Sequence, residues 1–257
     1  MLEDRTLARL PFLRPPSHLP APLPSERDFL ESPTVFRNDV SNHRIVAVGT
    51  HFIVKHGRAV EEIEGQTLLF LERYPSVSLT VPRLYAMWRM PSSGHLCLVM
   101  ERIPGENLES AWPTLTNDEK SAIFAKLKTG IDHIRSIPSP GFYGDSQGNK
   151  DTCGPFKSSS EFNAALIKKL RTIYAGNLDD FDAKDLQRKN ILFRKAGELV
   201  EVALIDWETA GWYPSYWEYA IKFCTLQWVD DWPQYLGACS GRKIEAVFAT
   251  VLWPFLF

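Results

Sequence analysis

Short runs of β-branched and aromatic residues dominate residues 44–103. Two of these runs, RIVAVG and HFIVKHG, are separated by a turn signal at Gly49–Thr50, which predicts a hairpin. In residues 60–74 the apolar side chains recur at helical spacing, although Gly65 costs this helix roughly 1 kcal/mol. Two later runs, SLTVPRLYAMWRM and GHLCLVMERI, predict two further strands. The pattern therefore predicts a small antiparallel sheet with one helix.

Beyond residue 106 the apolar positions follow helical spacing. Thr116 precedes an acidic first turn and a segment with apolar residues at 123, 127, 131 and 134, which predicts a long helix. Ser160 is expected to cap a second helix. Residues 191–205 break this pattern with two strand-like runs around a turn at 195–197. A small sheet domain followed by a larger, mainly helical domain with one hairpin predicts a two-lobed α+β fold.

The expected domain boundaries follow from the prolines and from the turn at Pro104–Gly105. Seven of the 18 prolines lie within residues 1–34, which favours an extended leader over 1–39, with a packed N-terminal segment as the alternative. The N-lobe is expected at 40–103 and the C-lobe at 104–257. The last apolar stretch, 246–257, predicts a buried helix whose partner or continuation is absent from this chain.

Composition narrows the class of protein. A chain of 257 residues, 44% of them hydrophobic, can form one large or two small domains. Its formal net charge of −2 argues against a nucleic-acid binder that tracks phosphates. The sequence shows neither an apolar run of the roughly 18 residues that span a membrane nor a secretory signal, and its four cysteines lack zinc spacing. We expect a cytoplasmic monomer that binds neither membranes nor nucleic acids.

Several common motifs are absent from the sequence. It contains no Gly-Lys dipeptide, so it has no Walker A loop, and neither a GxGxxG nor a GxSxG motif occurs. The six histidines form no metal-binding pair, and His51 and His56 are expected at the surface. These absences argue against P-loop and Rossmann nucleotide binding, and against serine or zinc hydrolases.

The strongest candidate for chemistry is Asp185-Leu-Gln-Arg-Lys-Asn190, which Asp206 follows 16 residues later. Phosphoryl transfer needs oxygen ligands for Mg²⁺ and a carboxylate that orients the attacking hydroxyl. Asn190 and Asp206 bracket the hairpin 191–205, so antiparallel pairing of its strands brings them within reach of one metal ion. A capped turn is the alternative interpretation of this spacing.

Lys55 and the helix that follows it fit the binding of phosphates. Lys55 ends an apolar strand, and a Glu64 on the buried edge of the helix would hold its ammonium toward two phosphates. Glu61 and Glu62 compete for that role, and a solvated surface lysine is the alternative.

The linker that leaves the sheet near residues 101–103 fits the edge of an adenine. A hinge strand has one unpaired rim, so backbone groups of Glu101 and Ile103 are candidates for this contact. A plain interdomain linker is the alternative.

In this order the pieces resemble aminoglycoside phosphotransferase-like proteins, which have the protein-kinase-like fold, and specifically the branch common in filamentous fungi. The resemblance covers roughly residues 40–235. It rests on VKHG (54–57), EGQTLLFLER (64–73), VPRLYA (81–86), LVMERIPGENLESAWPTL (98–115), GPFKSSSEFN (154–163), DLQRKNILF (185–193) and LIDWETAGWYPSYWEYA (204–220).

The resemblance implies ATP- and Mg²⁺-dependent phosphorylation of a hydroxyl on a small-molecule acceptor. It implies that Lys55 contacts the α- and β-phosphates and that Glu64 holds Lys55. It also implies that Asp185 orients the acceptor hydroxyl, and that Asn190 and Asp206 bind Mg²⁺.

The sequence departs from the family at four places. Ala183-Lys184 stands where the family has His-Gly or His-Ala, and only 22 residues separate Phe162 from Asp185. The nearest approach to a glycine-rich loop is Val46–Gly49. The chain is expected to be shortened before the catalytic loop and at its C-terminus. These departures favour the main alternative, a catalytically impaired kinase-like protein that binds a nucleotide or a partner. A protein kinase and an unrelated α+β protein are further alternatives.

Overall fold

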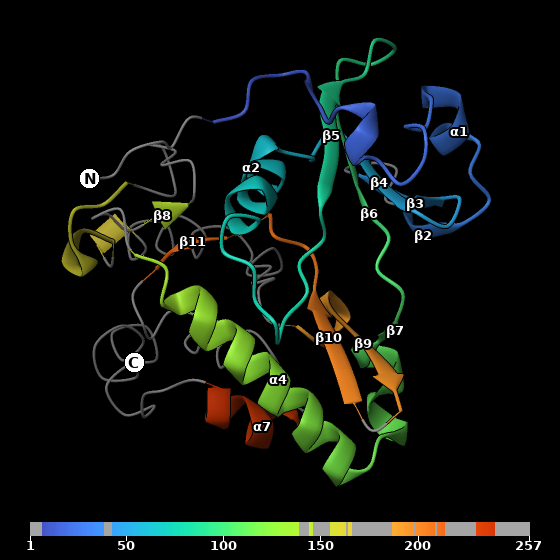
Figure 1. The fold of residues 1–257 in the computed structure, drawn as a ribbon. Coiled ribbons are helices and arrows are strands. Elements are labelled where there is room, and N and C mark those ends of the chain that lie inside the picture. Colours follow the sequence, from blue (N-terminus) through green and yellow to red (C-terminus); the bar gives the residue numbers. More distant parts are fainter. Residues whose placement is uncertain are drawn as a thin grey trace, which may run out of the picture.

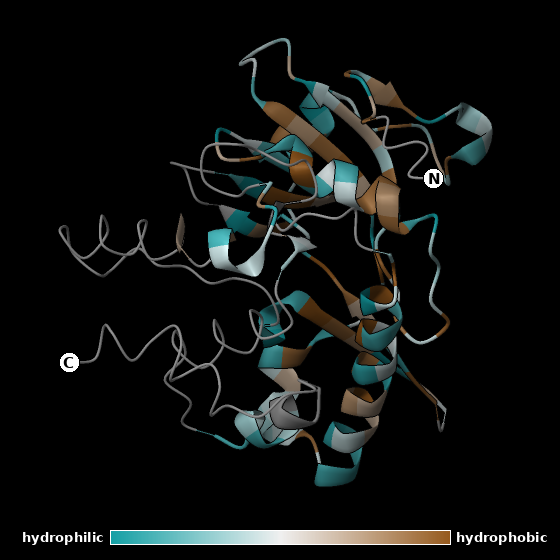
Figure 2. Cartoon of the chain, turned by 90° about the vertical axis from the view of Figure 1, so that its left-hand side faces the viewer, coloured by the Kyte–Doolittle hydropathy of each residue, from teal (hydrophilic) through white to brown (hydrophobic). Residues whose placement is uncertain are grey.

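The computed structural model describes residues 7–38, 43–138, 144–145, 155–162, 164–165, 187–197, 199–208, 210–213 and 230–239. In Figure 1 the sheet of the N-lobe lies above the long helix of the C-lobe. Figure 2 shows hydrophobic residues, in brown, along the strands of both lobes. The predicted α+β class, with an antiparallel sheet in the N-lobe, is confirmed.

The N-lobe is built on a six-stranded sheet in the order β1-β5-β6-β4-β3-β2, with every neighbouring pair antiparallel. Ile45 and Leu98 flank Lys55 on the neighbouring strands, so this lysine lies in the middle of the sheet. The strands are Phe12–Leu13 (β1), Val35–Asn38 (β2), Arg44–Val48 (β3), Phe52–Gly57 (β4), Leu84–Arg89 (β5) and Leu96–Glu101 (β6).

One face of this sheet carries the helix α2, Glu62–Leu71, which is shorter than the predicted 60–74. Gly65 lets the helix approach the sheet closely, because a Cβ at this position would lie 2.7 Å from Met87 Sδ and 3.2 Å from Leu98 Cδ2. The glycine that weakens the isolated helix is therefore required by its packing on the sheet.

The leader is packed where residues 7–34 are described, which corrects the extended conformation expected for it. Prolines flank two short elements without interrupting them: β1 and the helix α1, Glu26–Leu30, which Ser25 begins with a capping box. Phe29 of α1 is fully buried on the face of the sheet opposite α2, with its ring 5.1 Å from that of His56. His56 is buried as a result, so the surface position expected for it was wrong, whereas His51 is exposed.

The C-lobe combines the long helix α4, Asn117–Arg135, with a three-stranded sheet in the order β10-β9-β7. The hairpin predicted for 191–205 is confirmed as β9 and β10. The core includes Leu108, Ile123, Ile191 and Trp232. The other elements are β7 (Glu106–Asn107), α3 (Leu108–Ala111), η2 (Trp112–Thr114), β8 (Gly144–Asp145), η4 (Arg188–Asn190), β9 (Ile191–Ala196), β10 (Leu199–Leu204), β11 (Gly211–Trp212), α7 (Trp232–Cys239) and, before α1, η1 (Pro16–His18).

The helix starts predicted in this lobe are confirmed in one case and wrong in the other. Thr116 and Glu119 form a capping box at the start of α4. At the next helical segment Ser158 is the cap, since its Oγ accepts from the Glu161 N–H at 3.1 Å, and Ser160 already lies within the helix. Three consecutive serines offer three candidate caps, and the pattern alone favours none of them. The stretch 246–257 lies outside the described residues.

One connection between the lobes is the linker 102–105. The Arg102 N–H donates to the His51 carbonyl at 2.8 Å, which continues the pairing of β6 with β4. Gly105 then passes so close to β9 that a Cβ would lie 2.9 Å from the Phe193 carbonyl oxygen. The sheets of the two lobes are separate at this hinge, as predicted.

Another connection runs from the segment after α2 to β10. The Thr80 N–H donates to the Val202 carbonyl at 2.9 Å, and the Leu204 N–H donates back to the Thr80 carbonyl at 3.0 Å. The neighbouring Leu79 packs against α4 where Gly130 gives it room: a Cβ there would lie 2.3 Å from Leu79 Cβ. The segment after α2 is thus fixed to the strand that leads into Asp206.

In the described parts of the chain, no helix is long and apolar enough to cross a membrane.

Candidate active site

Lys55 forms the centre of the candidate site. It lies on the sheet face that α2 covers, and only 2% of the residue is exposed. Its ammonium nitrogen lies 2.8 Å from Glu64 Oε2, 2.9 Å from Asp206 Oδ1 and 2.9 Å from Glu208 Oε2. The ammonium donates hydrogen bonds to Asp206 and Glu208, and it meets Glu64 as an ion pair. The ion pair predicted between Lys55 and Glu64 is confirmed.

The two competitors for Glu64 point elsewhere. Glu61 is the residue before the first turn of α2 and is exposed. Glu62 forms an ion pair with Arg89 on β5, at 3.1 Å. Only Glu64 lies on the side of the helix that faces the sheet at Lys55, where it is buried.

The charges of the cluster depend on one another. Burial alone lowers the pKa of Lys55, but the carboxylates of Glu64, Asp206 and Glu208 outweigh it and hold this pKa above its ordinary value. Burial raises the pKa of Glu64, and the ammonium beside it acts in the opposite direction. Lys55 is therefore charged at neutral pH and keeps the carboxylates around it together.

Asp206 and Glu208 are brought to Lys55 by the turn that follows β10. Asp206 has a φ of +66°, a left-handed conformation that is uncommon for residues other than glycine and tends to occur at functional sites. Between them, Trp207 packs against the cluster of apolar residues under α2, and its indole N–H donates to the Leu204 carbonyl at 2.9 Å. The anchored ring fixes the turn between the lobes.

Glu208 is a site residue that the sequence reasoning missed. Its signal is the spacing Asp206-Trp207-Glu208, in which the apolar central residue is partly buried against the cluster under α2 and its two neighbours reach the same ammonium. Spacing of this kind is common on exposed strands, and the described fold is needed to distinguish the two cases.

Asn190 is the last residue of η4, immediately before β9, and is buried. The register of the hairpin pairs Ile191 with Leu204, and the Ile205 N–H donates to the Asn190 carbonyl at 2.9 Å. The backbone of Asn190 is therefore joined to the residue before Asp206, as the bracketing of the hairpin predicts. Asp185 and the neighbouring Ala183-Lys184 lie outside the described residues, so the position expected for Asp185 stays a prediction.

The turn that carries Asn190 is held from two sides. Asn107, at the N-terminus of α3, donates from Nδ2 to the Lys189 carbonyl at 2.6 Å. On the other side Arg188 pairs with Asp230 at 2.5 Å, and its guanidinium carbon lies 5.3 Å from the centre of the Trp232 ring.

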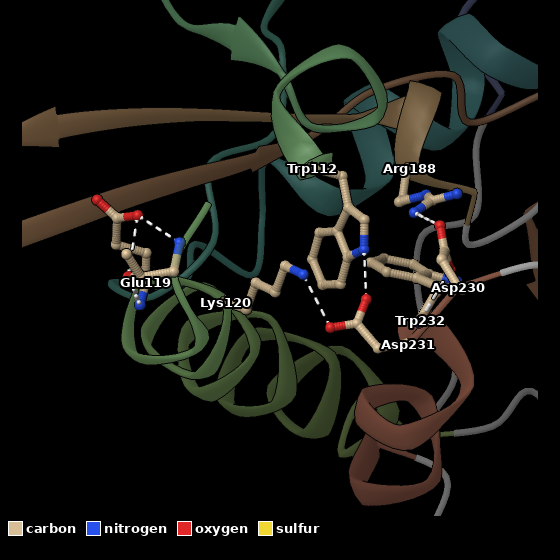
Figure 3. A network of polar contacts seen from close by, with 8 residues as sticks. Trp112, Glu119, Lys120, Arg188, Asp230, Asp231 and Trp232 are labelled. Atoms are coloured by element: carbon tan, nitrogen blue, oxygen red, sulfur yellow. Dashed lines mark hydrogen bonds and ion pairs between the residues drawn. The ribbon is translucent and has the colours of Figure 1, made fainter. Parts of the chain in front are cut away.

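Figure 3 shows how this second contact continues into α4. The Trp112 indole N–H donates to Asp231 at 2.9 Å, and the Lys120 ammonium donates to the same carboxylate at 2.8 Å. The Lys120 ammonium also lies 4.5 Å from the centre of the Trp112 ring. Neighbouring carboxylates, Asp230 and Asp231, thus connect the turn before β9 to the C-lobe core.

The hinge residues Glu101 and Ile103 lie at the end of β6 and just beyond it. The backbone of Arg102 pairs with His51, the residue before β4, so the backbone groups of its two neighbours point away from β4. The Glu101 N–H donates to the Arg83 carbonyl at 2.8 Å, and the Ile103 N–H has no acceptor among the described residues.

The run Val46–Gly49, the nearest approach to a glycine-rich loop in the sequence, forms the end of β3 and the start of the turn that follows it. Gly49 joins β3 and β4 at the end remote from Lys55, where its carbonyl accepts from Arg102 Nη1 at 2.7 Å. The chain enters β3 at the near end through His43, which is buried. Burial and the charge of Lys55 lower the pKa of His43.

The donor set fits Mg²⁺. Carboxylate oxygens of Glu64, Asp206 and Glu208 lie within 4.8 Å of one another, and hard oxygen donors are the ligands that Mg²⁺ prefers. One ammonium leaves two of their three negative charges uncompensated, which matches a divalent cation. Glu64 is enclosed with Lys55, whereas the side chains of Asp206 and Glu208 are 19% and 21% exposed and are the donors that an ion can reach.

Comparisons with known proteins give the class of fold. No protein-family model and no curated protein matches the chain. Among solved structures, the apo form of a thermostable mutant of aminoglycoside phosphotransferase APH(4)-Ia is similar with a TM-score of 0.55 at 16% identity, over 87% of this chain and 79% of that one. The ternary complex of such a mutant with ADP and hygromycin B gives 0.55 at 15% identity, over 77% and 74%.

The GDP and kanamycin complex of APH(2")-IIia is similar with a TM-score of 0.51 at 15% identity, over 88% of this chain and 84% of that one. At these identities the similarity shows the fold alone. The chain therefore has the kinase-like fold of the aminoglycoside phosphotransferases.

Proposed function

We propose that the protein is an ATP- and Mg²⁺-dependent phosphotransferase that phosphorylates a hydroxyl group of a small molecule. The observation that carries this proposal is the buried ammonium of Lys55, enclosed by Glu64 from the N-lobe and by Asp206 and Glu208 from the C-lobe. A buried lysine beside a surplus of carboxylates, in a kinase-like fold, matches the needs of a nucleotide whose phosphates are bridged by a metal ion.

The proposed roles follow from position and chemistry. Lys55 contacts the α- and β-phosphates, and Glu64 keeps its ammonium in place. Asn190 and Asp206 hold Mg²⁺, and Glu208 offers a further oxygen. When bound, the ion neutralises the charge of the phosphates and aligns them.

The remaining groups bind the base and the acceptor. The Glu101 carbonyl and the Ile103 N–H are the proposed contacts for the adenine edge, because this rim of the hinge is not paired with β4. Asp185 is proposed to accept a hydrogen bond from the acceptor hydroxyl and to orient it for in-line attack. The proposed partners are ATP and the acceptor.

The acceptor is proposed to be a small polyhydroxylated molecule. The similar solved structures include complexes with kanamycin and hygromycin B, which makes aminoglycosides the first compounds to test. The resemblance of the motifs to the branch common in filamentous fungi widens the panel to other small hydroxylated metabolites.

A second candidate is a catalytically impaired kinase-like protein that binds the nucleotide without transferring phosphate. The sequence Ala183-Lys184 favours it, because a lysine beside Asp185 can pair with the carboxylate that should meet the acceptor.

A coupled assay of ADP release, with MgATP and a panel of hydroxylated small molecules, separates the two functions. The proposal predicts acceptor-dependent release that Asp185→Asn abolishes, while nucleotide affinity is retained. Nucleotide binding without release for any acceptor would support the impaired protein instead. Absence of nucleotide binding would contradict both.

A further inference from the structure

We propose that residues 8–14, which we name the strap, are a positioning element that fixes α2 and thereby holds the Glu64–Lys55 ion pair in the geometry that binds a nucleotide. This inference rests on the proposed function and extends it to residues outside the cleft. In Figure 1 the strap, in dark blue, runs from the region of α2 to β5.

Gln66 forms the first attachment of α2 to the strap. Its side-chain amide is buried and pairs with the backbone of Ala8 at both ends: Oε1 accepts from the Ala8 N–H at 2.9 Å, and Nε2 donates to the Ala8 carbonyl at 2.8 Å. Two bonds to one residue fix both the position and the orientation of the strap. Gln66 is only two residues from Glu64, so this attachment acts on the turn of α2 that carries the site carboxylate.

Arg14 forms the second attachment, at the C-terminal end of α2. Its Nε donates to the Leu84 carbonyl at 2.5 Å, and its guanidinium forms an ion pair with Glu72, the C-cap residue of α2. The Arg14 N–H donates to the Tyr85 carbonyl at 3.0 Å, which continues the pairing of β1 with β5. Arg14 therefore connects the end of α2 to the sheet on which it packs.

Apolar packing joins the two attachments. Phe12 of the strap lies opposite Met87 on β5, and Met87 is the residue that Gly65 of α2 approaches. Leu10 and Phe12 pack on the same apolar cluster as Leu68 of α2. Seven of the ten residues of α2 are buried, which indicates a helix that is covered on more than the face toward the sheet.

The consequence for the site is geometric. Glu64 meets Lys55 at 2.8 Å, so a small shift of α2 moves the carboxylate away from the ammonium. Misplacement by about 1 Å can cost a catalytic site as much as roughly 100-fold in rate. Because coupling between two sites is reciprocal, a nucleotide bound through Lys55 should in turn stabilise the strap.

The test compares three variants of the full chain. Gln66→Ala removes the attachment at Ala8, and Arg14→Ala removes the attachment at Glu72. Arg27→Ala is the matched control, because the Arg27–Glu31 pair lies on the leader but is solvent-exposed and does not touch α2. The affinity for MgADP, measured by calorimetry, is expected to fall by about fivefold or more in the first two variants, the lower end of typical coupling between sites.

Hydrogen exchange provides a readout that does not depend on the cleft. The amides of α2 should exchange faster in Gln66→Ala and Arg14→Ala than in wild type or Arg27→Ala. In the wild-type protein, saturation with MgADP should slow the exchange of the Ala8 and Arg14 amides, which lie on the strap. Arg14→Lys keeps the charge opposite Glu72 but loses the planar guanidinium, which can bond Glu72 and the Leu84 carbonyl together. Its affinity for MgADP should therefore lie between those of Arg14→Ala and wild type.

The outcomes separate this proposal from the proposed function. If the variants unfold at lower urea concentration but bind MgADP as tightly as wild type, the strap is only a structural support and the inference is overturned. If wild type binds no nucleotide, the proposed function fails. In that case, unchanged hydrogen exchange of the α2 amides in Gln66→Ala and Arg14→Ala would also overturn the inference about the strap. Faster exchange of these amides would support the conclusion that the strap fixes α2.

Discussion

Replacing Lys55 by methionine should turn the cluster around it into a site whose stability depends on Mg²⁺. The change keeps the bulk of the side chain and removes the positive charge. Carboxylate oxygens of Glu64, Asp206 and Glu208 lie within 4.8 Å of one another, so each pair repels by about 3.5 kcal/mol at an effective dielectric constant of 20. Partial exposure of Asp206 and Glu208 to solvent reduces this repulsion. The free energy of unfolding of Lys55→Met should therefore be lower than that of wild type by about 3 kcal/mol, as for other uncompensated buried charges.

Urea unfolding at several pH values and Mg²⁺ concentrations measures the effect. Burial already raises the pKa of Glu64, and loss of the ammonium raises it further, so the variant should be most stable at low pH and lose stability as the pH rises through that value. The proposed Mg²⁺ site exists in the folded state only, so Mg²⁺ should stabilise Lys55→Met more than wild type.

Lys128→Met is the matched control, since Lys128 forms an exposed ion pair with Asp132 on α4. Loss of an exposed pair should cost no more than about 0.5 kcal/mol, without dependence on Mg²⁺. The reasoning is refuted if Lys55→Met is as stable as wild type at neutral pH, or if Mg²⁺ stabilises both proteins equally.

Two further predictions concern the C-lobe. Gly130→Ala brings a Cβ within 2.3 Å of Leu79 Cβ, so it should lower the free energy of unfolding by about 1–3 kcal/mol despite the better helix propensity of alanine. Adding Leu79→Ala to this variant should recover part of the loss. Additive losses of the two substitutions in urea unfolding would argue against the clash. The hydrogen bond from Lys120 lowers the pKa of Asp231 below its ordinary value of 3.8, so the ionised carboxylate stabilises the fold above that pH. This stabilisation is lost as the pH falls through the lowered pKa. Asp231→Asn should therefore make the free energy of unfolding less dependent on pH in the acid range, and an unchanged dependence would exclude this contribution.

Hairpins and amphipathic helices were predictable because their signals are local. The strands around Lys55 and the hairpin 191–205 follow from short apolar runs and turn residues, and the capping box of Thr116 follows from four consecutive residues. The ion pair of Lys55 with Glu64 was predictable too, because helical spacing places Glu64 on the buried edge of its helix.

The features that were missed depend on long-range contacts. Prolines mark where elements end, but they do not show that Phe29 would be buried over His56. Gly65 counts against a helix by propensity, and its role is visible only beside Met87. Glu208 joins the site because Trp207 is anchored under α2, a contact between segments more than a hundred residues apart. The N-terminal end of β3 lies nearer to Lys55 than Gly49 does, and this follows from strand register rather than from glycine content.

Calorimetric titration with ATP, once with Mg²⁺ and once with EDTA, tests the central claim most directly. The metal site is proposed at Asp206, so wild-type affinity should depend on Mg²⁺ and Asp206→Asn should lose that dependence. Asp118→Asn, a neutralised exposed carboxylate on α4, should behave as wild type. The account predicts at least about a tenfold loss of MgATP affinity in Asp206→Asn, the equivalent of about 1.4 kcal/mol. Equal affinity of Asp206→Asn and wild type for MgATP would contradict it.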